Sequence, residues 1–73
     1  MSKHIIGVYP ICNTASILIH KIDFAKNKVL ASMNNKAEEW CKMEEYDYYN
    51  LGTPEYGFYY GDIFVPFCEV MRY

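Results

Sequence analysis

Hydrophobic and polar positions alternate with a period of two along several short stretches of this chain, which is the pattern of half-buried β-strands. The plainest stretch covers residues 16–24, where strict alternation places Ile19 and Ile22 on opposite sides. A second stretch covers residues 29–33 and places three apolar side chains on one side. The intervening residues 25–28 have turn chemistry, so the two stretches predict a β-hairpin.

The most aromatic run in the chain covers residues 56–67, which read YGFYYGDIFVPF. Within it, two apolar arms at 58–60 and 63–65 flank the pair Gly61 and Asp62. Gly61 can adopt the positive φ that a tight hairpin turn needs at its first central position. The run therefore predicts a second β-hairpin, and because an isolated hairpin is unstable in water, the earlier segments must cover it.

The remaining segments are shorter and less regular. Residues 4–9 predict a first strand that ends at Pro10, because proline cannot donate a hydrogen bond to a ladder. Asn34–Asn35 is a turn signal, and residues 46–55 predict a loop because Asn, Gly and Pro punctuate them. Residues 67–72 predict one helical turn with apolar side chains facing inward.

Residues 36–46 fit two structures. Good helix formers run through this segment, which favours a helix. As a strand, the segment would place Cys41 and Met43 on one side and Trp40 with Lys42 on the other. We favour the strand because its neighbours are β-rich. The predicted fold is mainly β, a small antiparallel meander or partly open barrel with a short C-terminal helical turn; an α+β fold with a helix at about 36–46 is the alternative.

Length and composition limit what can stabilise this fold. The 73 residues form a single domain, residues 1–73, without room for a second core. A domain of this size buries only about 60–65% of its unfolded surface. Aromatic residues make up 18% of the chain, and each buried ring removes roughly 150–250 Å² from water. We therefore expect aromatic rings to supply much of the core.

Charge and cysteine content bear on partners and location. The net charge of −2 and the single arginine, Arg72, argue against general binding to a phosphate backbone. No apolar run approaches ~18 residues, so we expect no transmembrane helix and no membrane partner. Three widely spaced cysteines, Cys12, Cys41 and Cys68, favour buried, reduced thiols in a cytoplasmic protein.

Residues that could support catalysis or bind a metal lack the motifs that usually accompany them. No Cys-x-x-Cys or His-x-x-x-His pair is present to start a zinc site, and no glycine-rich phosphate loop is present. His20 lies within an apolar strand, where the expected role is a core histidine satisfied by one hydrogen bond. We therefore expect no enzyme activity, no metal and no cofactor.

The order of three segments resembles a family of small proteins. These segments are 28–31 (KVLA), 39–44 (EWCKME) and 56–65 (YGFYYGDIFV), and the chain then ends in Met71–Arg72 before the last tyrosine. Together they resemble small β-meander proteins of phages and integrative mobile elements of low-GC Gram-positive bacteria. The likeness covers the C-terminal two thirds of the chain and departs from the family pattern at 66–68. It implies a barrel-like sheet, a mobile-element origin and a location in the cytoplasm of a bacterial host; no catalytic residue transfers with it.

An acidic, tyrosine-rich stretch is the candidate interaction surface. Aromatic side chains that suit binding hot spots alternate there with carboxylates that suit arginine and lysine donors. The candidate partner-binding residues are Glu38, Glu39, Trp40, Glu44, Glu45, Tyr46, Asp47, Tyr48 and Tyr49. They predict a non-enzymatic accessory protein that binds a host protein with a basic groove. Given the resemblance, one form of this role is an inhibitor of a nucleic-acid-processing or defence effector, in the manner of an anti-CRISPR-like protein.

Two other functions stay open. A small barrel can bind single-stranded nucleic acid or a nucleotide by stacking on Tyr56, Tyr59 or Tyr60, but the scattered basic residues do not favour a nucleic-acid partner. A self-associating structural subunit is the third interpretation, because so many aromatic residues in a short chain can leave a patch that only a homodimer covers.

Overall fold

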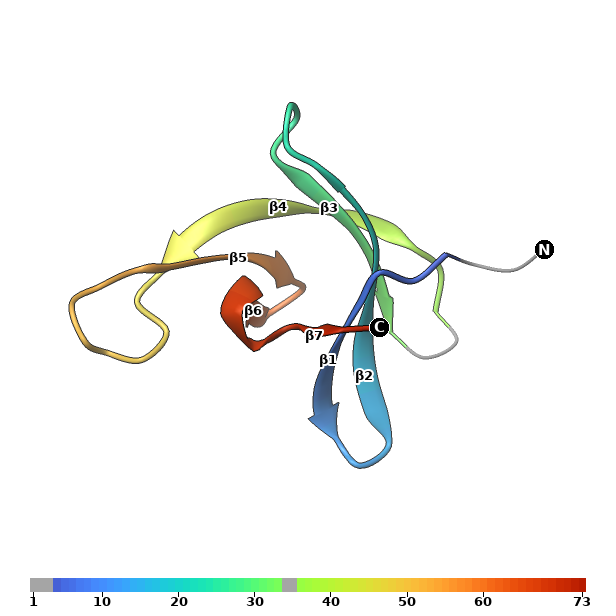
Figure 1. The fold of residues 1–73 in the computed structure, drawn as a ribbon, viewed down its shortest axis with the longest axis horizontal. Coiled ribbons are helices and arrows are strands. Elements are labelled where there is room, and N and C mark those ends of the chain that lie inside the picture. Colours follow the sequence, from blue (N-terminus) through green and yellow to red (C-terminus); the bar gives the residue numbers. More distant parts are fainter. Residues whose placement is uncertain (1–3, 34–35) are drawn as a thin grey trace.

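The computed structural model describes residues 4–33 and 36–73. Over these residues the chain forms seven antiparallel strands in one sheet, with the order β6-β5-β4-β3-β2-β1-β7 (Figure 1). The elements in chain order are β1 (Gly7–Cys12), β2 (Ala15–Asp23), β3 (Lys28–Met33), β4 (Glu39–Tyr46), β5 (Glu55–Tyr60), β6 (Ile63–Pro66), the 3₁₀ turn η1 (Phe67–Glu69) and β7 (Met71–Arg72). Strands β1 to β6 form a meander, and β7 returns to pair with β1.

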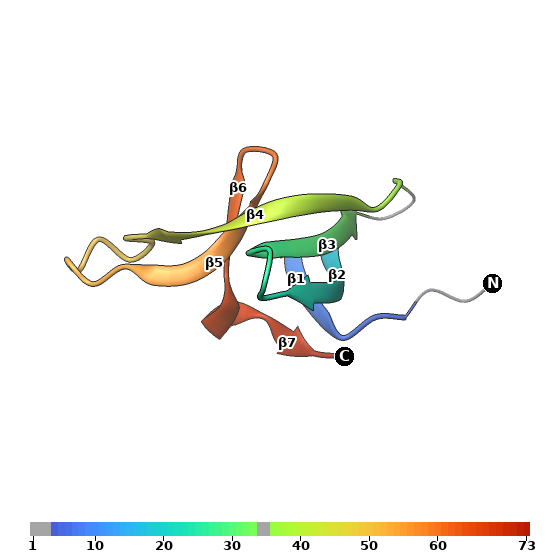
Figure 2. The same cartoon turned by 90° about the horizontal axis from the view of Figure 1, so that it is seen from above.

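The predicted fold class is confirmed, because the protein is mainly β and the sheet curls into a half-barrel (Figure 2). The predicted C-terminal helical turn is present as η1, although it is shorter than expected and gives way to β7. No described helix is long and apolar enough to cross a membrane.

The alternative helix at about 36–46 does not form, because these residues supply β4. Cys41 and Met43 are buried, whereas Trp40 and Lys42 on the other side are exposed, as the strand interpretation predicted. The first four residues of β4 pair with β3, and the last four pair with β5. Strand β4 is therefore the element that joins the two halves of the sheet.

Both predicted hairpins are confirmed by the strand pairing. Asn27 in the first turn has a φ of 59°, and Gly61 in the second turn has a φ of 62°. Asn27 also donates its side-chain amide to the Met43 carbonyl and accepts from the Tyr56 hydroxyl, which ties the first turn to β4 and β5. The turn predicted at Asn34–Asn35 lies outside the described residues.

Two local predictions were wrong. Pro10 does not end the first strand; it lies inside β1, which pairs with β7 only at Gly7 and Val8, and a strand edge tolerates proline. The alternation in β2 is broken by a bulge, because the register with β3 shifts between Ile19 and Lys21. Ile22 therefore packs against the same core as Ile19, rather than on the opposite side.

The core lies on one side of the sheet and takes side chains from five strands. Its buried members are Ile17, Ile19, Val29, Ala31, Cys41, Met43, Phe58, Tyr60 and Val65. The 3₁₀ turn covers part of this core, since the Phe67 ring lies 5.9 Å from the Phe58 ring and Val70 packs against the cluster. Aromatic rings contribute as the composition predicted, although most of the buried side chains are aliphatic or small.

Strands β5 and β6 approach each other closely at Gly57, just before the chain turns from β6 into η1. A Cβ atom at this position would lie 2.8 Å from the Pro66 Cα and still closer to the Val65 carbonyl oxygen. Both neighbours are backbone atoms, which cannot move aside without breaking the strand pairing. Position 57 therefore requires glycine, because there is no space for a Cβ atom.

We expect Gly57→Ala to lower the free energy of unfolding by about 3 kcal/mol, because the new methyl group must displace backbone in a packed interior. Gly52→Ala is the matched control: nothing lies within 4 Å of its Cβ position and only its positive φ of 76° is strained, so its cost is about 1 kcal/mol. Urea unfolding followed by circular dichroism measures both, and equal losses would contradict the close approach of β5 and β6.

Candidate protein-binding surface

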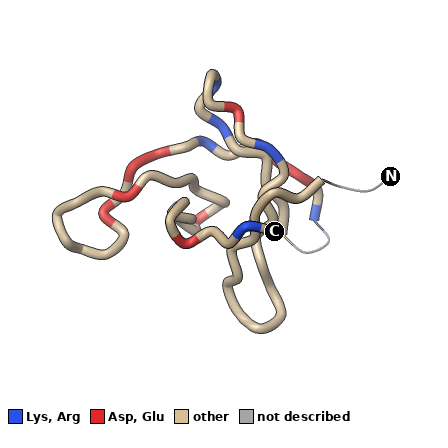
Figure 3. Tube along the Cα trace, in the orientation of Figure 1, with Lys and Arg blue, Asp and Glu red and all other residues tan. Residues whose placement is uncertain are grey.

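The carboxylates are unevenly distributed over the fold. Residues 43–70 contain six carboxylates and no lysine, arginine or histidine. They comprise the second half of β4, the loop that follows it, β5, β6 and η1. Figure 3 shows the acidic positions along the end of β4 and the adjoining loop, whereas blue lysine positions gather around the β2–β3 hairpin. We call residues 43–70 the acidic lobe.

The nine predicted partner-binding residues do not share one face. Eight are exposed and Asp47 is half-buried. Glu39 and Trp40 lie at the start of β4 beside β3, whereas Glu44 and Glu45 lie beside β5. A strand rises about 3.3 Å per residue, so the two ends of the eight-residue β4 are roughly 20 Å apart. The structure thus divides the predicted surface into two parts.

Asp47 has a structural role in the loop after β4. Its two carboxylate oxygens accept hydrogen bonds from the backbone N–H groups of Leu51, at 3.0 Å, and Gly52, at 3.1 Å. The Asp47 carbonyl accepts a further bond from the Asn50 N–H at 3.2 Å. The side chain therefore closes the loop at a point where Asn50 and Gly52 have positive φ.

Most tyrosines of the acidic lobe form an aromatic cluster on the side of the sheet away from the core: Tyr46, Tyr48, Tyr49 and Tyr59 pack with Phe64. The Tyr46 ring lies 5.3 Å from the Phe64 ring and 6.2 Å from the Tyr59 ring. Tyr48 contacts both Phe64 and Tyr49. Phe64 is buried beneath these rings. The cluster stabilises the lobe and leaves Tyr46 48% exposed at its surface.

Hydroxyl and carboxylate groups connect this cluster to the other end of the chain. The Tyr9 and Tyr48 hydroxyls are 3.1 Å apart, and this hydrogen bond, together with burial, raises the pKa of Tyr9 to about 12. The Tyr49 hydroxyl donates to the Glu69 carboxylate, which is the main reason that the pKa of Tyr49 is raised. Tyr48 and Tyr49 therefore tie the loop to β1 and η1.

Glu44, Glu45 and Tyr46 remain as the part of the predicted surface without an internal polar role. Within the described chain, neither glutamate side chain has a hydrogen bond or an ion pair with another residue. Both are exposed, but only Glu44 shares the outer face of β4 with the half-exposed Tyr46 ring, because Glu45 alternates to the face of Met43. An unpaired Glu44 carboxylate beside a rigid aromatic ring can accept arginine or lysine donors from a partner, and Glu45 adds charge at the opposite face of the strand.

The cysteines differ from the expectation that all three are buried. Only Cys41 is buried, and burial raises the pKa of its thiol to about 11, with a further contribution from Glu39. Cys12 and Cys68 are exposed free thiols. Hydrogen bonds to Thr14 lower the pKa of Cys12, and the Cys68 thiol donates to Glu55 at 3.4 Å. Among the described residues no group of three potential ligands could hold a metal ion.

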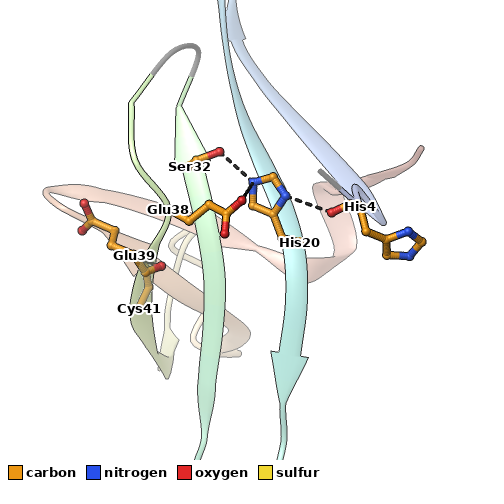
Figure 4. Close-up of polar contacts among 6 residues, drawn as sticks. All are labelled: His4, His20, Ser32, Glu38, Glu39 and Cys41. Carbon is orange, nitrogen blue, oxygen red and sulfur yellow. Dashed lines mark hydrogen bonds and ion pairs between the residues drawn. The ribbon is translucent and has the colours of Figure 1, made fainter. Parts of the chain in front are cut away.

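His20 forms a polar cluster that sequence reasoning anticipated only in part (Figure 4). Its Nδ1 donates to the His4 carbonyl at 2.9 Å, which leaves Nε2 to accept from the Ser32 hydroxyl at 2.7 Å. Glu38 lies 3.9 Å from the same Nε2. A serine beside a histidine base has the geometry of an activated nucleophile. However, Ser32 is 0% exposed, so its hydroxyl cannot reach a substrate in this conformation.

Comparison with protein-family models, with curated proteins and with solved structures finds no match to this chain. Its function therefore has to be inferred from its own residues.

We expect Ser32→Ala to lower the free energy of unfolding by about 2 kcal/mol, because it leaves the buried His20 ring nitrogen without its donor. Ser16→Ala, at a half-buried serine of the same β2–β3 region, should change it by less than about 0.5 kcal/mol. Thermal unfolding of the two variants makes the comparison. An unchanged stability in Ser32→Ala would contradict a structural role for the His20 cluster.

Asp47→Ala should lower the free energy of unfolding by about 2 kcal/mol, since it removes two charge-assisted hydrogen bonds to the loop backbone. Glu44→Ala, which removes an exposed carboxylate from β4, should be neutral within about 0.5 kcal/mol. Amide hydrogen exchange at Leu51 and Gly52 gives a local readout. Equal protection in the parent and Asp47→Ala would show that the carboxylate does not hold the loop.

Proposed function

We propose that this protein is a non-enzymatic binding protein whose acidic lobe docks on a basic surface of a partner protein. The observation that carries the proposal is the charge distribution, in which residues 43–70 hold six carboxylates and no basic side chain. Such a one-signed surface attracts an oppositely charged partner over long range and raises the association rate. Glu44 and Tyr46, which share the outer face of β4, would form the centre of the contact, and Glu45 would add negative charge at its edge.

The energetics also favour this part of the surface. An aromatic ring that is already packed loses little conformational entropy on binding, and Tyr46 is held against Phe64 and Tyr59. The adjacent carboxylates have no internal partner to give up, so pairing them with arginine or lysine breaks no existing interaction. Asp47, Tyr48 and Tyr49 would support the surface from behind by fixing the loop.

The partner class follows from the resemblance to mobile-element proteins. A small acidic protein of this kind would act as an inhibitor when it occupies the basic groove in which a host effector holds nucleic acid. Its carboxylates would then accept the same donors that normally contact phosphates. A nucleic-acid-processing or defence effector in the bacterial cytoplasm is the partner that we propose.

Stacking of bases on Tyr56, Tyr59 or Tyr60 is less well supported. Tyr60 is buried in the core, and Tyr59 packs in the aromatic cluster. Tyr56 is exposed, but its ring contacts Phe67 and its hydroxyl bonds to Asn27. The carboxylates of the acidic lobe would also repel phosphates from these rings.

The proposal is tested by reversing the charge of Glu44 and Glu45. Glu44→Lys with Glu45→Lys should weaken partner binding by about 100-fold or more, because like charges then face each other across the interface. The matched control is Glu38→Lys with Glu39→Lys, which makes the same charge change at the other end of the β4 region and should keep binding within a few-fold.

The partner is first captured from a lysate of a low-GC Gram-positive host and identified, and both variants are then titrated against it at several salt concentrations. Binding of the parent should weaken with salt because the contact is electrostatic. A folded Glu44→Lys/Glu45→Lys variant that still binds, or an equal loss in both variants, would rule out the acidic lobe as the docking surface.

A further inference from the structure

A second, oppositely charged patch lies on the outer side of β2, β3 and β4. Two neighbouring cross-strand rows build it: Lys21 pairs with Leu30, which pairs with Trp40, and Asp23 pairs with Lys28, which pairs with Lys42. Lys26 adds a fourth lysine from the β2–β3 turn. We call Lys21, Lys26, Lys28, Trp40 and Lys42 the lysine–tryptophan patch.

The bulge in β2 helps to assemble this patch. Because the register with β3 shifts between Ile19 and Lys21, Lys21 falls opposite the outward side chain Leu30 rather than on the core side. Strict alternation in the sequence places Lys21 with Ile17 and Ile19. The lysines are dispersed between positions 21 and 42, and only the strand register brings them together.

The positive charges of the patch are not neutralised internally. Within the part of the chain that the structure describes, none of the four lysines has a carboxylate within 4 Å. Asp23 is the one acidic neighbour in the two rows, and its carboxylate accepts the backbone N–H of Lys26 at 3.1 Å. Lys28 lies directly opposite Lys42, and like charges in this position destabilise a sheet. A bound anion would relieve this repulsion.

A pocket of about 180 Å³ opens within the patch, and Asp23, Lys26, Lys28 and Trp40 line it. It is smaller than the roughly 300–1,000 Å³ of a site for a whole drug-sized molecule, so it suits one ring. Trp40 is 47% exposed although it is the largest side chain of the protein. Its ring therefore offers a flat apolar wall between ammonium groups.

We propose that the lysine–tryptophan patch binds a nucleoside phosphate, with the base against Trp40 and the phosphate between Lys28 and its neighbouring lysines. Proteins that bind single-stranded nucleic acids combine aromatic side chains, on which bases stack, with nearby positive charges. A free nucleotide presents the same chemistry, so the experiment distinguishes the two sources. This site adjoins the acidic lobe at Lys42 and at the β2–β3 turn, but the proposal does not depend on the proposed protein partner.

The test uses Trp40 as its own reporter, because it is the single tryptophan of the chain. The intact protein is titrated at low salt with an oligothymidine of about twelve nucleotides, within the range of single-strand site sizes, and separately with adenosine monophosphate. We expect saturable quenching of tryptophan emission. Raising salt from about 50 to 200 mM should weaken binding of the oligonucleotide roughly twentyfold, as expected for about three neutralised phosphates.

Paired variants locate the site. Lys28→Gln with Lys42→Gln should weaken binding about tenfold or more. Lys36→Gln with Arg72→Gln removes the same two charges outside the patch and should change affinity less than about twofold. Trp40→Ala, followed by anisotropy of a labelled oligonucleotide, should also weaken binding roughly tenfold or more, because the stacking platform is lost. Circular dichroism confirms that each variant is folded; if Trp40→Ala does not fold, the lysine variants decide.

If adenosine monophosphate binds as tightly as the oligonucleotide, the proposal is supported and the site is assigned to free nucleotides. Quenching that needs the oligonucleotide supports it and assigns the site to a single strand. No quenching by either ligand, equal weakening in both lysine variants, or equal quenching by polyglutamate, which has no base to stack, would overturn it.

Discussion

The pairing of β4 with two different neighbours is the interaction on which the rest of the structure depends. Its first four residues complete the sheet of β2 and β3, and its last four begin the sheet of β5 and β6. Cys41 and Met43 lie at this change of partner and both point into the core. The core is therefore shared by the two halves, and neither half could bury its apolar side without β4.

The same strand separates the two charged surfaces. Trp40 and Lys42 belong to the half with the lysines, whereas Glu44 and Tyr46 belong to the half with the carboxylates. The two ends of β4 are roughly 20 Å apart, and the Debye length is about 8 Å at physiological ionic strength. The distant ends therefore differ in sign, whereas Lys42 and Glu44, two residues apart on one face, mark the boundary between the two surfaces; the chain as a whole carries a net charge of only −2. The two proposed docking surfaces, both on one small sheet, would together allow the protein to hold two ligands.

Most of the fold could be predicted from the sequence, but much less of the candidate site could. Period-two alternation and the turn residues Asn27 and Gly61 predicted both hairpins, because those signals are local. The bulge in β2 was missed, since a one-residue register shift depends on the partner strand rather than on the chain itself. For the same reason Trp40 was grouped with the glutamates beside it in sequence, whereas the register places it among lysines from other strands. The loop role of Asp47 could have been anticipated from Asn50 and Gly52, which require a stabilised turn.

The separation of charge across β4 can be measured directly by nuclear magnetic resonance with a cationic and an anionic paramagnetic cosolute. The cationic probe should relax the amide protons around Glu44 and Glu45 faster, and the anionic probe those around Lys28 and Lys42. Relaxation that does not differ between the two probes along β4 would contradict the account.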